Sequence, residues 1–231
     1  MLTLWRKNEA TVFGWGKDFE SYGIRHCQFF GDPKLSETWT ALDALLIENF
    51  PTEDGRELRV ACTFIDSGDG SMTDTVYQYT KPRERGRVFA IKGASTVGKP
   101  LVSQPTQNNR YRAHLFVLGV DAGKRLVRHR QTVQDIGPAF VHFPRGRDDG
   151  FTEEYFKQLT AEVFVRKFEK GKLTESWKKI RERNEALDCC VYATAAIELM
   201  RPYFERLFQQ DPENEPVVRH ARRRIQSKGV L

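Results

Sequence analysis

The feature that most constrains the fold is a short, almost unbroken apolar run at Leu58–Ile65, which ends at Asp66. A run of this length is typical of a central strand that helices cover on both faces, because neither of its sides meets water. Further apolar runs at Arg87–Ile91 and His114–Val120 predict neighbouring strands. The sequence therefore predicts a single α/β domain.

Hydrophobic spacing and turn residues predict the remaining elements. We expect a hairpin (Thr11–Trp15 with Tyr22–Phe30), a short strand at Phe140–Phe143, a helix that ends at Thr80, and helices at Leu35–Phe50, Ala122–Arg130, Glu153–Phe168 and Glu185–Phe208. The segments 99–112 and 144–150 are expected to be loops. The domain should span residues 1–208 and be followed by a basic tail at residues 209–231.

Composition excludes several classes of protein. Hydrophobic residues make up 39% of the 231 residues and aromatic residues 12%, which is enough for a core and argues against wholesale disorder. No apolar run approaches the ~18 residues of a membrane span, and the start lacks a signal-peptide core. The four cysteines form no CxxC pair, which favours a reducing cytoplasm over a zinc site or a disulfide framework. The net charge of 37 − 31 = +6 indicates a polyanionic partner.

Three acidic residues are candidates for a metal site. Asp66 follows the central strand, at the sheet edge where α/β folds bind ligands. Glu185 and Asp188 are three residues apart at the head of an apolar helix, so they share one face. The alternatives are that Asp66 caps the following turn and that the two helix acids only favour the helix N-terminus. Together, such acids suit one or two Mg²⁺ or Mn²⁺ ions that act on a phosphodiester.

Basic residues concentrate in the central third of the chain. Lys92 ends a predicted strand, where it either neutralises a phosphate or is simply solvated. The candidates for contact with a DNA backbone are Lys92, Lys99, Arg110, Arg112 and Lys124. The alternative is that these cations only form solvated faces.

Two further motifs point away from other functions. Gly93–Lys99 matches the start of a phosphate-binding GxxxxGK loop, but Pro100 replaces the Ser or Thr that holds Mg²⁺. No nucleotide is therefore expected. Asp121 ends a predicted strand, and we expect it to cap the next helix rather than to bind a metal.

Six segments, in order along the chain, resemble a known family. They are Thr63–Gly68, Val88–Ser95, Leu118–Asp121, Val141–Pro144, Gln158–Glu162 and Arg183–Cys189. These segments resemble the C-terminal nuclease half of the lambda-type (GpA) phage terminase large subunit, over residues 9–199. The resemblance implies an RNase H-like mixed sheet flanked by helices. It also implies a divalent-metal endonuclease that cuts concatemeric double-stranded DNA at packaging in the host cytoplasm, with the portal protein and the terminase small subunit as partners.

The resemblance assigns roles to particular residues. Asp66 would be the acid of the central strand, Glu185 the acid of the closing helix with Asp188 close by, and Lys92 would lie near the active site or DNA. The family's first strand ends in an Asp, whereas Met1–Asn8 contains no acid. Glu9 is the nearest acid, but it would belong to the wrong element. The family's ATPase motor lies upstream of the region that this chain matches. The alternative function is therefore a catalytically impaired module that binds DNA or docks on the portal.

Overall fold

A computed structural model describes residues 2–3, 7–107, 110–145, 149–169 and 171–209. The strands are β1 (Leu2–Thr3), β2 (Lys7–Trp15), β3 (Ser21–Phe30), β4 (Phe50–Pro51), β5 (Glu57–Leu58), β6 (Thr63–Asp66), β7 (Val88–Ala94), β8 (Thr106–Gln107), β9 (His114–Gly119), β10 (Val141–His142), β11 (Glu162–Glu169) and β12 (Lys172–Lys179). The helices are α1 (Ser36–Ile47), α2 (Thr73–Thr80), α3 (Val120–Arg130), α4 (Glu153–Leu159) and α5 (Glu185–Gln209), with short 3₁₀ turns at Lys17–Phe19 and Lys81–Gly86.

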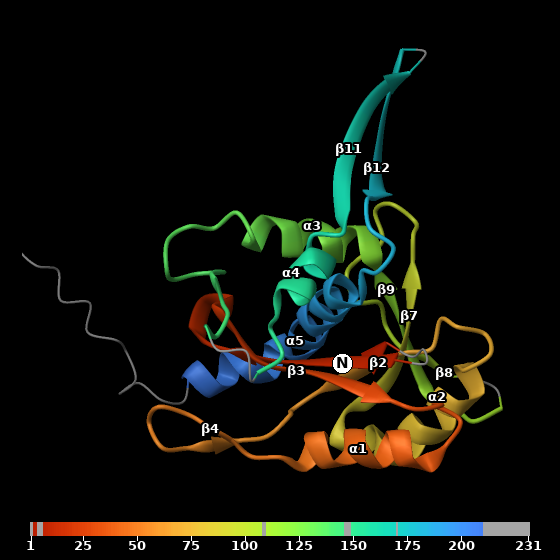
Figure 1. Cartoon of the computed structure of the whole chain (residues 1–231), viewed down its shortest axis with the longest axis vertical. Coiled ribbons are helices and arrows are strands. Elements are labelled where there is room, and N and C mark those ends of the chain that lie inside the picture. Colours follow the sequence, from red (N-terminus) through yellow and green to blue (C-terminus); the bar gives the residue numbers. More distant parts are fainter. Residues whose placement is uncertain (1, 4–6, 108–109, 146–148, 170, 210–231) are drawn as a thin grey trace, which may run out of the picture.

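Eight of the strands form one mixed sheet in the order β10-β3-β2-β1-β6-β7-β9-β8 (Figure 1). The strands β1, β2 and β3 are antiparallel neighbours. The strands β1, β6, β7 and β9 run parallel. A three-stranded antiparallel meander continued by parallel strands is the arrangement expected of an RNase H-like fold, so the expected fold class is confirmed.

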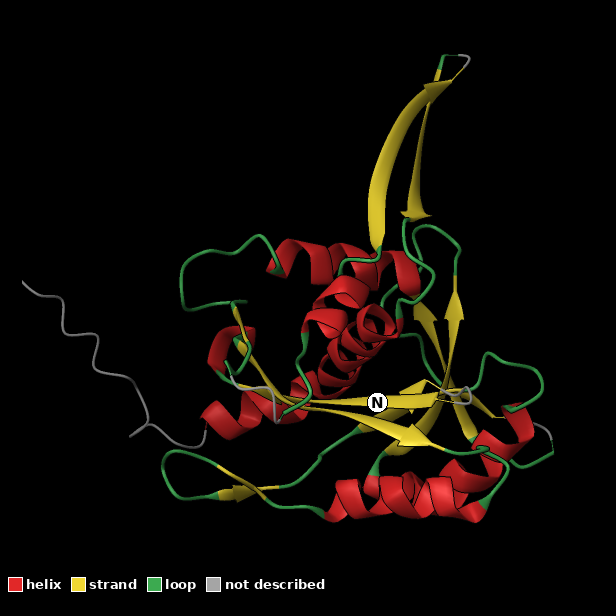
Figure 2. Ribbon diagram, viewed as in Figure 1, coloured by secondary structure: helices red, strands yellow, loops and turns green. Residues whose placement is uncertain are grey.

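Helices cover both faces of this sheet (Figure 2). Adjacent residues of a strand point to opposite faces. Accordingly, Phe64 of β6 packs in the cluster that contains residues of α3, α4 and α5, and the next residue, Ile65, packs in the cluster formed with α1 and α2. Both side chains are fully buried. The central strand is thus covered on both sides, as its apolar sequence predicts.

The central strand is shorter than the apolar run suggested. Only Thr63–Asp66 of that run joins the main sheet as β6. Leu58 instead pairs with Phe50 in the small β4–β5 sheet, where its side chain is 50% exposed. The expectation of a strand across the whole run is therefore wrong at its first half, because apolar character alone does not say which sheet a residue joins.

The helix expected at Glu153–Phe168 is also wrong in its second half. The helix α4 ends at Leu159, and β11 begins three residues later at Glu162. The residues of β11 are rich in β-branched and aromatic side chains, and they pair along their full length with β12. The partner strand had not been predicted, and a lone apolar segment does not distinguish a strand from a helix.

The other predicted elements are found with small changes at their ends. The expected hairpin is β2–β3, and the expected closing helix is α5. In the described part of the chain, no helix has the length and apolar character needed to cross a membrane. Residues 210–231 of the expected basic tail lie outside the described residues.

Candidate metal and DNA site

Asp66 is the last residue of β6, at the carboxyl end of the parallel strands. Its Oδ1 accepts the Gly68 backbone N–H at 2.8 Å, and its Oδ2 accepts the Tyr192 hydroxyl of α5 at 3.1 Å. Burial raises the pKa of Asp66, while these hydrogen bonds and the Lys92 ammonium lower it. Asp66 therefore closes the turn after β6 and also connects the sheet to α5.

Asp188 lies in the first turn of α5 and shares the electrostatic environment of Asp66. Burial raises the pKa of Asp188 to about 7, and the Lys124 ammonium opposes this rise. The negative charges of Glu162, Asp66 and Glu185 raise the pKa further. Four carboxyl groups thus act on one another where β6, α5 and β11 meet, and they include the three acids predicted from the sequence.

Glu162 is a member of this acid cluster for which the sequence analysis assigned no role. It is the first residue of β11, and its Oε2 accepts from Lys124 Nζ at 2.6 Å. The side-chain amide of Asn184 donates to Glu162 Oε1 at 3.0 Å and to Asp188 Oδ2 at 3.1 Å. Glu162 belongs to the last-but-one segment of the family resemblance, which is the signal that points to it. The expected helix through this region concealed its position at the start of a strand.

Arg183 connects the rim of the cluster to a buried acid. Its guanidinium donates to Glu9 Oε1 at 2.6 Å and to Glu185 Oε2 at 3.3 Å. Glu9 is fully buried on β2, and its Oε2 has no hydrogen-bond partner among the described residues. The nearest cationic group to that oxygen is His26 Nε2 at 3.5 Å. Glu9 thus lies on the strand beside the first one, and Arg183 holds its carboxylate.

The strand β1 occupies the centre of the sheet, between β2 and β6. Its two residues, Leu2 and Thr3, are not acidic, and Leu2 pairs with Ile65, next to Asp66. The described part of the first strand therefore supplies no carboxylate, as the acid-free start of the sequence predicts. Glu9 lies opposite Thr3 on β2 and is the acid nearest to this strand in the pairing.

The basic residues predicted to contact DNA occupy different places. Lys92 is exposed on β7 beside Asp66, and Lys124 of α3 is bound to Glu162. Lys99 is half-buried in the loop after β7. Arg110 forms an ion pair with Asp74 of α2 at 2.6 Å, and Arg112 follows two residues later. Contacts therefore connect Lys92 and Lys124 to the acids, whereas Arg110 is connected to α2.

The structure changes one expectation and accounts for another. Asp121 lies inside the first turn of α3 and does not cap it; instead it accepts from the Trp177 indole at 3.0 Å and from the Arg125 guanidinium at 2.9 Å. The capping role expected of Asp121 is therefore wrong, because the helix begins one residue earlier. The run Gly93–Pro100 ends β7 and enters a loop, and residues 95–105 contain no helix at whose start a phosphate would bind.

The acids suit a divalent cation by their chemistry, although they do not form a closed cage. Among the described residues, no three His, Cys, Asp or Glu side chains are arranged to hold one metal ion. Mg²⁺ is commonly bound by one or two carboxylates, while water and substrate phosphates complete its coordination. Asp66 and Asp188 fit that pattern, since a cation between them would relieve the repulsion that raises the pKa of Asp188.

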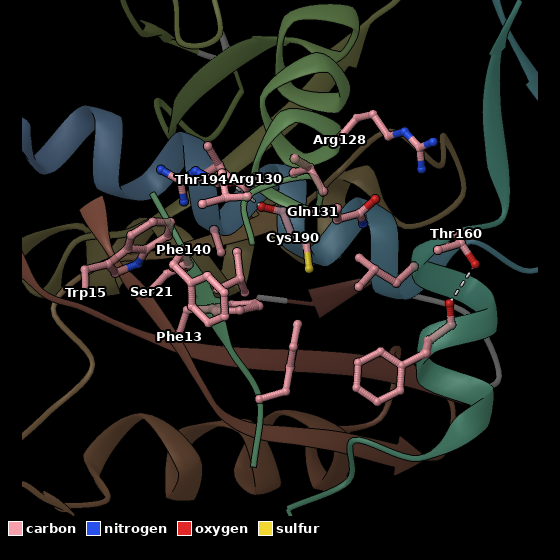
Figure 3. Close-up of a pocket in the computed structure, with 17 residues that line it drawn as sticks. Phe13, Trp15, Ser21, Arg128, Arg130, Gln131, Phe140, Thr160, Cys190 and Thr194 are labelled. Carbon is pink, nitrogen blue, oxygen red and sulfur yellow. Dashed lines mark hydrogen bonds between the residues drawn. The ribbon is translucent and has the colours of Figure 1, made fainter. Parts of the chain in front are cut away.

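A separate apolar cavity of about 400 Å³ lies beside α5 (Figure 3). Its lining includes Phe13, Trp15 and Cys190, and among the described residues that line it none is acidic. The Arg130 guanidinium stacks over the Trp15 ring at 4.6 Å, and burial lowers its pKa to about 10. This cavity is therefore not the site of the acids, which lie at the edge of the sheet.

Comparison with known proteins gives the family. A family model for the endonuclease domain of the terminase large subunit gpA matches residues 6–207. The chain belongs to this family. The terminase large subunit of Escherichia phage lambda is 34% identical over 195 residues, and that of Enterobacteria phage P21 is 33% identical over 198 residues. Each match covers 83% of this chain but only 30% of the relative. No solved structure matches the chain.

In this gpA endonuclease domain, the segments of the family resemblance gather around the acids. Thr63–Gly68 forms β6 and its turn, Val88–Ser95 forms β7, and Arg183–Cys189 begins α5. The family resemblance read from the sequence is therefore confirmed. Since the chain spans less than a third of the length of these relatives, activities of the whole relatives do not pass to it directly.

Proposed function

We propose that this chain is the nuclease part of a phage terminase large subunit, a divalent-metal-dependent endonuclease that cuts concatemeric double-stranded DNA during genome packaging. The observation that carries the proposal is the meeting of Asp66 and Asp188 at the carboxyl end of β6, in a chain of the gpA endonuclease family. The packaging setting adds further proposals: the host cytoplasm as location, and the portal protein and the terminase small subunit as partners.

Asp66 and Asp188 would hold the cation, with Glu185 at the rim as a third oxygen donor. When bound, a divalent ion supplies a polarised water and charge stabilisation at the phosphodiester. The Tyr192 hydroxyl orients Asp66, and the Asn184 amide orients Asp188. These hydrogen bonds fix where the carboxylate oxygens point.

Two lysines would manage the charge of the substrate. Lys92 is exposed next to Asp66, where its ammonium would bind a phosphate of the DNA backbone. Lys124 is bound to Glu162, so it lowers the repulsion among the acids while no DNA is present. A divalent cation and a phosphate together would balance the negative charge of this cluster.

One observation favours a second candidate function, a catalytically impaired module that binds DNA or docks on the portal. The strand β1 carries no acid in its described residues, and Glu9 on β2 is already bound to Arg183. A nuclease that lacks a carboxylate on its central strand would hold its cation more weakly.

Cleavage of supercoiled plasmid separates the two candidates. We expect nicking and then linearisation with Mn²⁺ or Mg²⁺, none with EDTA, and a loss of at least about 100-fold in rate for Asp66→Asn. The control is Asp54→Asn, because Asp54 is an exposed acid in the loop between β4 and β5. Cleavage that persists in Asp66→Asn would contradict the assigned site. A folded wild-type chain that cleaves nothing would leave only the impaired module.

A further inference from the structure

The strands β11 and β12 form a two-stranded arm that projects from the body of the protein (Figure 1). Their eight cross-strand pairs run from Glu162–Lys179 at the root to Glu169–Lys172 near the tip. At ~3.3 Å per residue, eight residues make an arm about 26 Å long. The arm belongs to neither face of the main sheet, so packing of the core does not explain it.

The root of the arm is fixed to the body. The Ile180 backbone N–H donates to the Ala161 carbonyl at 2.8 Å, which closes the base of the ribbon. Phe164 and Trp177 pack together with ring centroids 5.2 Å apart, and the Trp177 indole donates to Asp121 of α3 at 3.0 Å. The arm therefore leaves the body in a direction that side-chain contacts set.

The root is also part of the acid cluster. Glu162, the first residue of β11, binds Lys124 and Asn184. After β12, the chain returns within a few residues to Arg183 and Glu185. Whatever polymer reaches the acids must therefore pass close to the base of the arm.

Charge divides between the two faces of the arm. On one face, the Arg166 and Arg125 guanidinium groups bind Glu175 at 2.8 and 3.0 Å, so its charges are paired within the protein. The other face, which we call the lysine face, carries alternate residues of both strands: Val163, Val165, Lys167, Glu169, Lys172, Thr174, Ser176 and Lys178. Its three lysines are exposed and form no ion pair with any side chain that the structure describes.

The spacing of these lysines suits a nucleic-acid backbone. Lys178 pairs with Val163, Lys167 is four residues further along β11, and Lys172 pairs two residues beyond that. The three ammonium groups therefore span about 20 Å along the ribbon. A two-stranded ribbon also fits the major groove of B-DNA, which is about 12 Å wide.

We propose that the lysine face of the arm binds the phosphate backbone of duplex DNA held at Asp66 and Asp188. The proposal rests on the proposed function for the identity of the polymer. Duplex DNA is favoured over an acidic protein because the arm grows out of the acid cluster at Glu162, where the scissile strand would lie. The arm thus lengthens the DNA-binding surface beyond Lys92 and Lys124.

DNA binding measured in EDTA tests the arm without any cleavage. The variant Lys167→Gln/Lys172→Gln/Lys178→Gln is compared with wild type on a 30-base-pair duplex by fluorescence anisotropy, over a series of salt concentrations. We expect the Kd to rise about 10-fold or more and the slope of log K against log[salt] to fall by up to about 3, since each lost phosphate contact removes ~0.9. A control with the same charge change, Lys17→Gln/Lys34→Gln/Arg59→Gln, should change the Kd less than about 2-fold, because these cations lie away from the arm.

A shortened arm gives an independent check. Replacing residues 167–174 by Asn-Gly joins Arg166 to Glu175 by a two-residue turn and keeps the root intact. This variant loses Lys167 and Lys172, and it should weaken DNA binding in the same direction while its thermal unfolding remains cooperative.

The outcomes separate the arm from the nuclease. Unchanged affinity and salt slope in the triple variant would overturn the proposal and assign the arm to another partner, and so would a wild-type chain that binds no duplex. Weakened binding by the triple variant, in a protein whose wild type cleaves nothing, would support the arm and reject the nuclease. Weakened binding together with cleavage that depends on Asp66 and recovers at high protein concentration would support both.

Discussion

At the scale of single residues, Asp188 shows the cost of gathering acids. Its pKa rises from 3.8 to about 7 because burial and three neighbouring carboxylates disfavour its charge. A raised folded-state pKa gives stability that is complete below the unfolded pKa and is lost as the pH rises through the folded pKa. Between pH 4 and pH 7, the ionisation of Asp188 therefore progressively destabilises the fold.

The variant Asp188→Asn should consequently unfold at a higher temperature than wild type at pH 8. We expect a gain of about 1–4 kcal/mol at pH 8, from a shift of about three units at ~1.4 kcal/mol each, and almost no gain at pH 4. The Asn side chain keeps an oxygen for the Asn184 amide. Melting curves at both pH values measure the difference. A variant that is less stable than wild type at pH 8 would contradict the raised pKa.

Arg183 is the second residue whose removal has a clear consequence. Replacing Arg183 by Gln leaves the Glu9 carboxylate fully buried and without its guanidinium partner. We expect a loss of about 2–3 kcal/mol in urea unfolding at pH 7, because an uncompensated buried charge is costly. The exposed pair Arg201–Glu198 provides the control, and Arg201→Gln should change stability by less than about 0.5 kcal/mol. Equal effects of the two substitutions would show that the Glu9 pair is not important for stability.

At the scale of elements, the crossing of α3 and α5 depends on one glycine. A Cβ added at Gly123 of α3 would lie 2.5 Å from Val191 Cγ1 of α5 and 3.1 Å from Leu101 Cδ1. This close approach allows α5 to lie against α3, so that Asp188 at the head of α5 comes near Lys124 of α3.

The substitution Gly123→Ala sets two effects against each other. Helix propensity alone predicts a gain of about 1 kcal/mol, whereas overpacking at a tight crossing costs about 1–3 kcal/mol. Because the contact with Val191 is so short, we expect net destabilisation in urea unfolding and partial rescue by Val191→Ala. A stabilised Gly123→Ala protein would mean that the two helices separate readily.

The elements also show which parts of the fold a sequence reveals. Apolar runs and turn residues predict β6, β7, β9 and α5, because each of these elements buries its side chains in the core next to it. The arm was not predicted, since its strands are stabilised by pairing with each other rather than by burial. Half-exposed residues such as Val163 and Leu173 lack the hydrophobic pattern that helps to identify a buried strand.

At the scale of the whole molecule, the candidate site could be read from the sequence only in part. Asp66, Glu185 and Asp188 were found because they stand at the ends of elements with strong patterns. Glu162 and Asn184 were not found as site residues, because their positions depend on how α4, the arm and α5 meet in three dimensions. Ends of elements are local features of a sequence, whereas contacts between distant elements are not.

The central claim is that Asp66 and Asp188 form one site for a divalent cation, and calorimetric titration with Mn²⁺ at pH 7.5 tests it most directly. We expect wild type and Asp54→Asn to bind Mn²⁺ alike, and Asp66→Asn and Asp188→Asn each to bind at least about 10-fold more weakly, since both carboxylates hold the same ion. Unchanged Mn²⁺ affinity in both variants, or no binding by wild type, would contradict the claim.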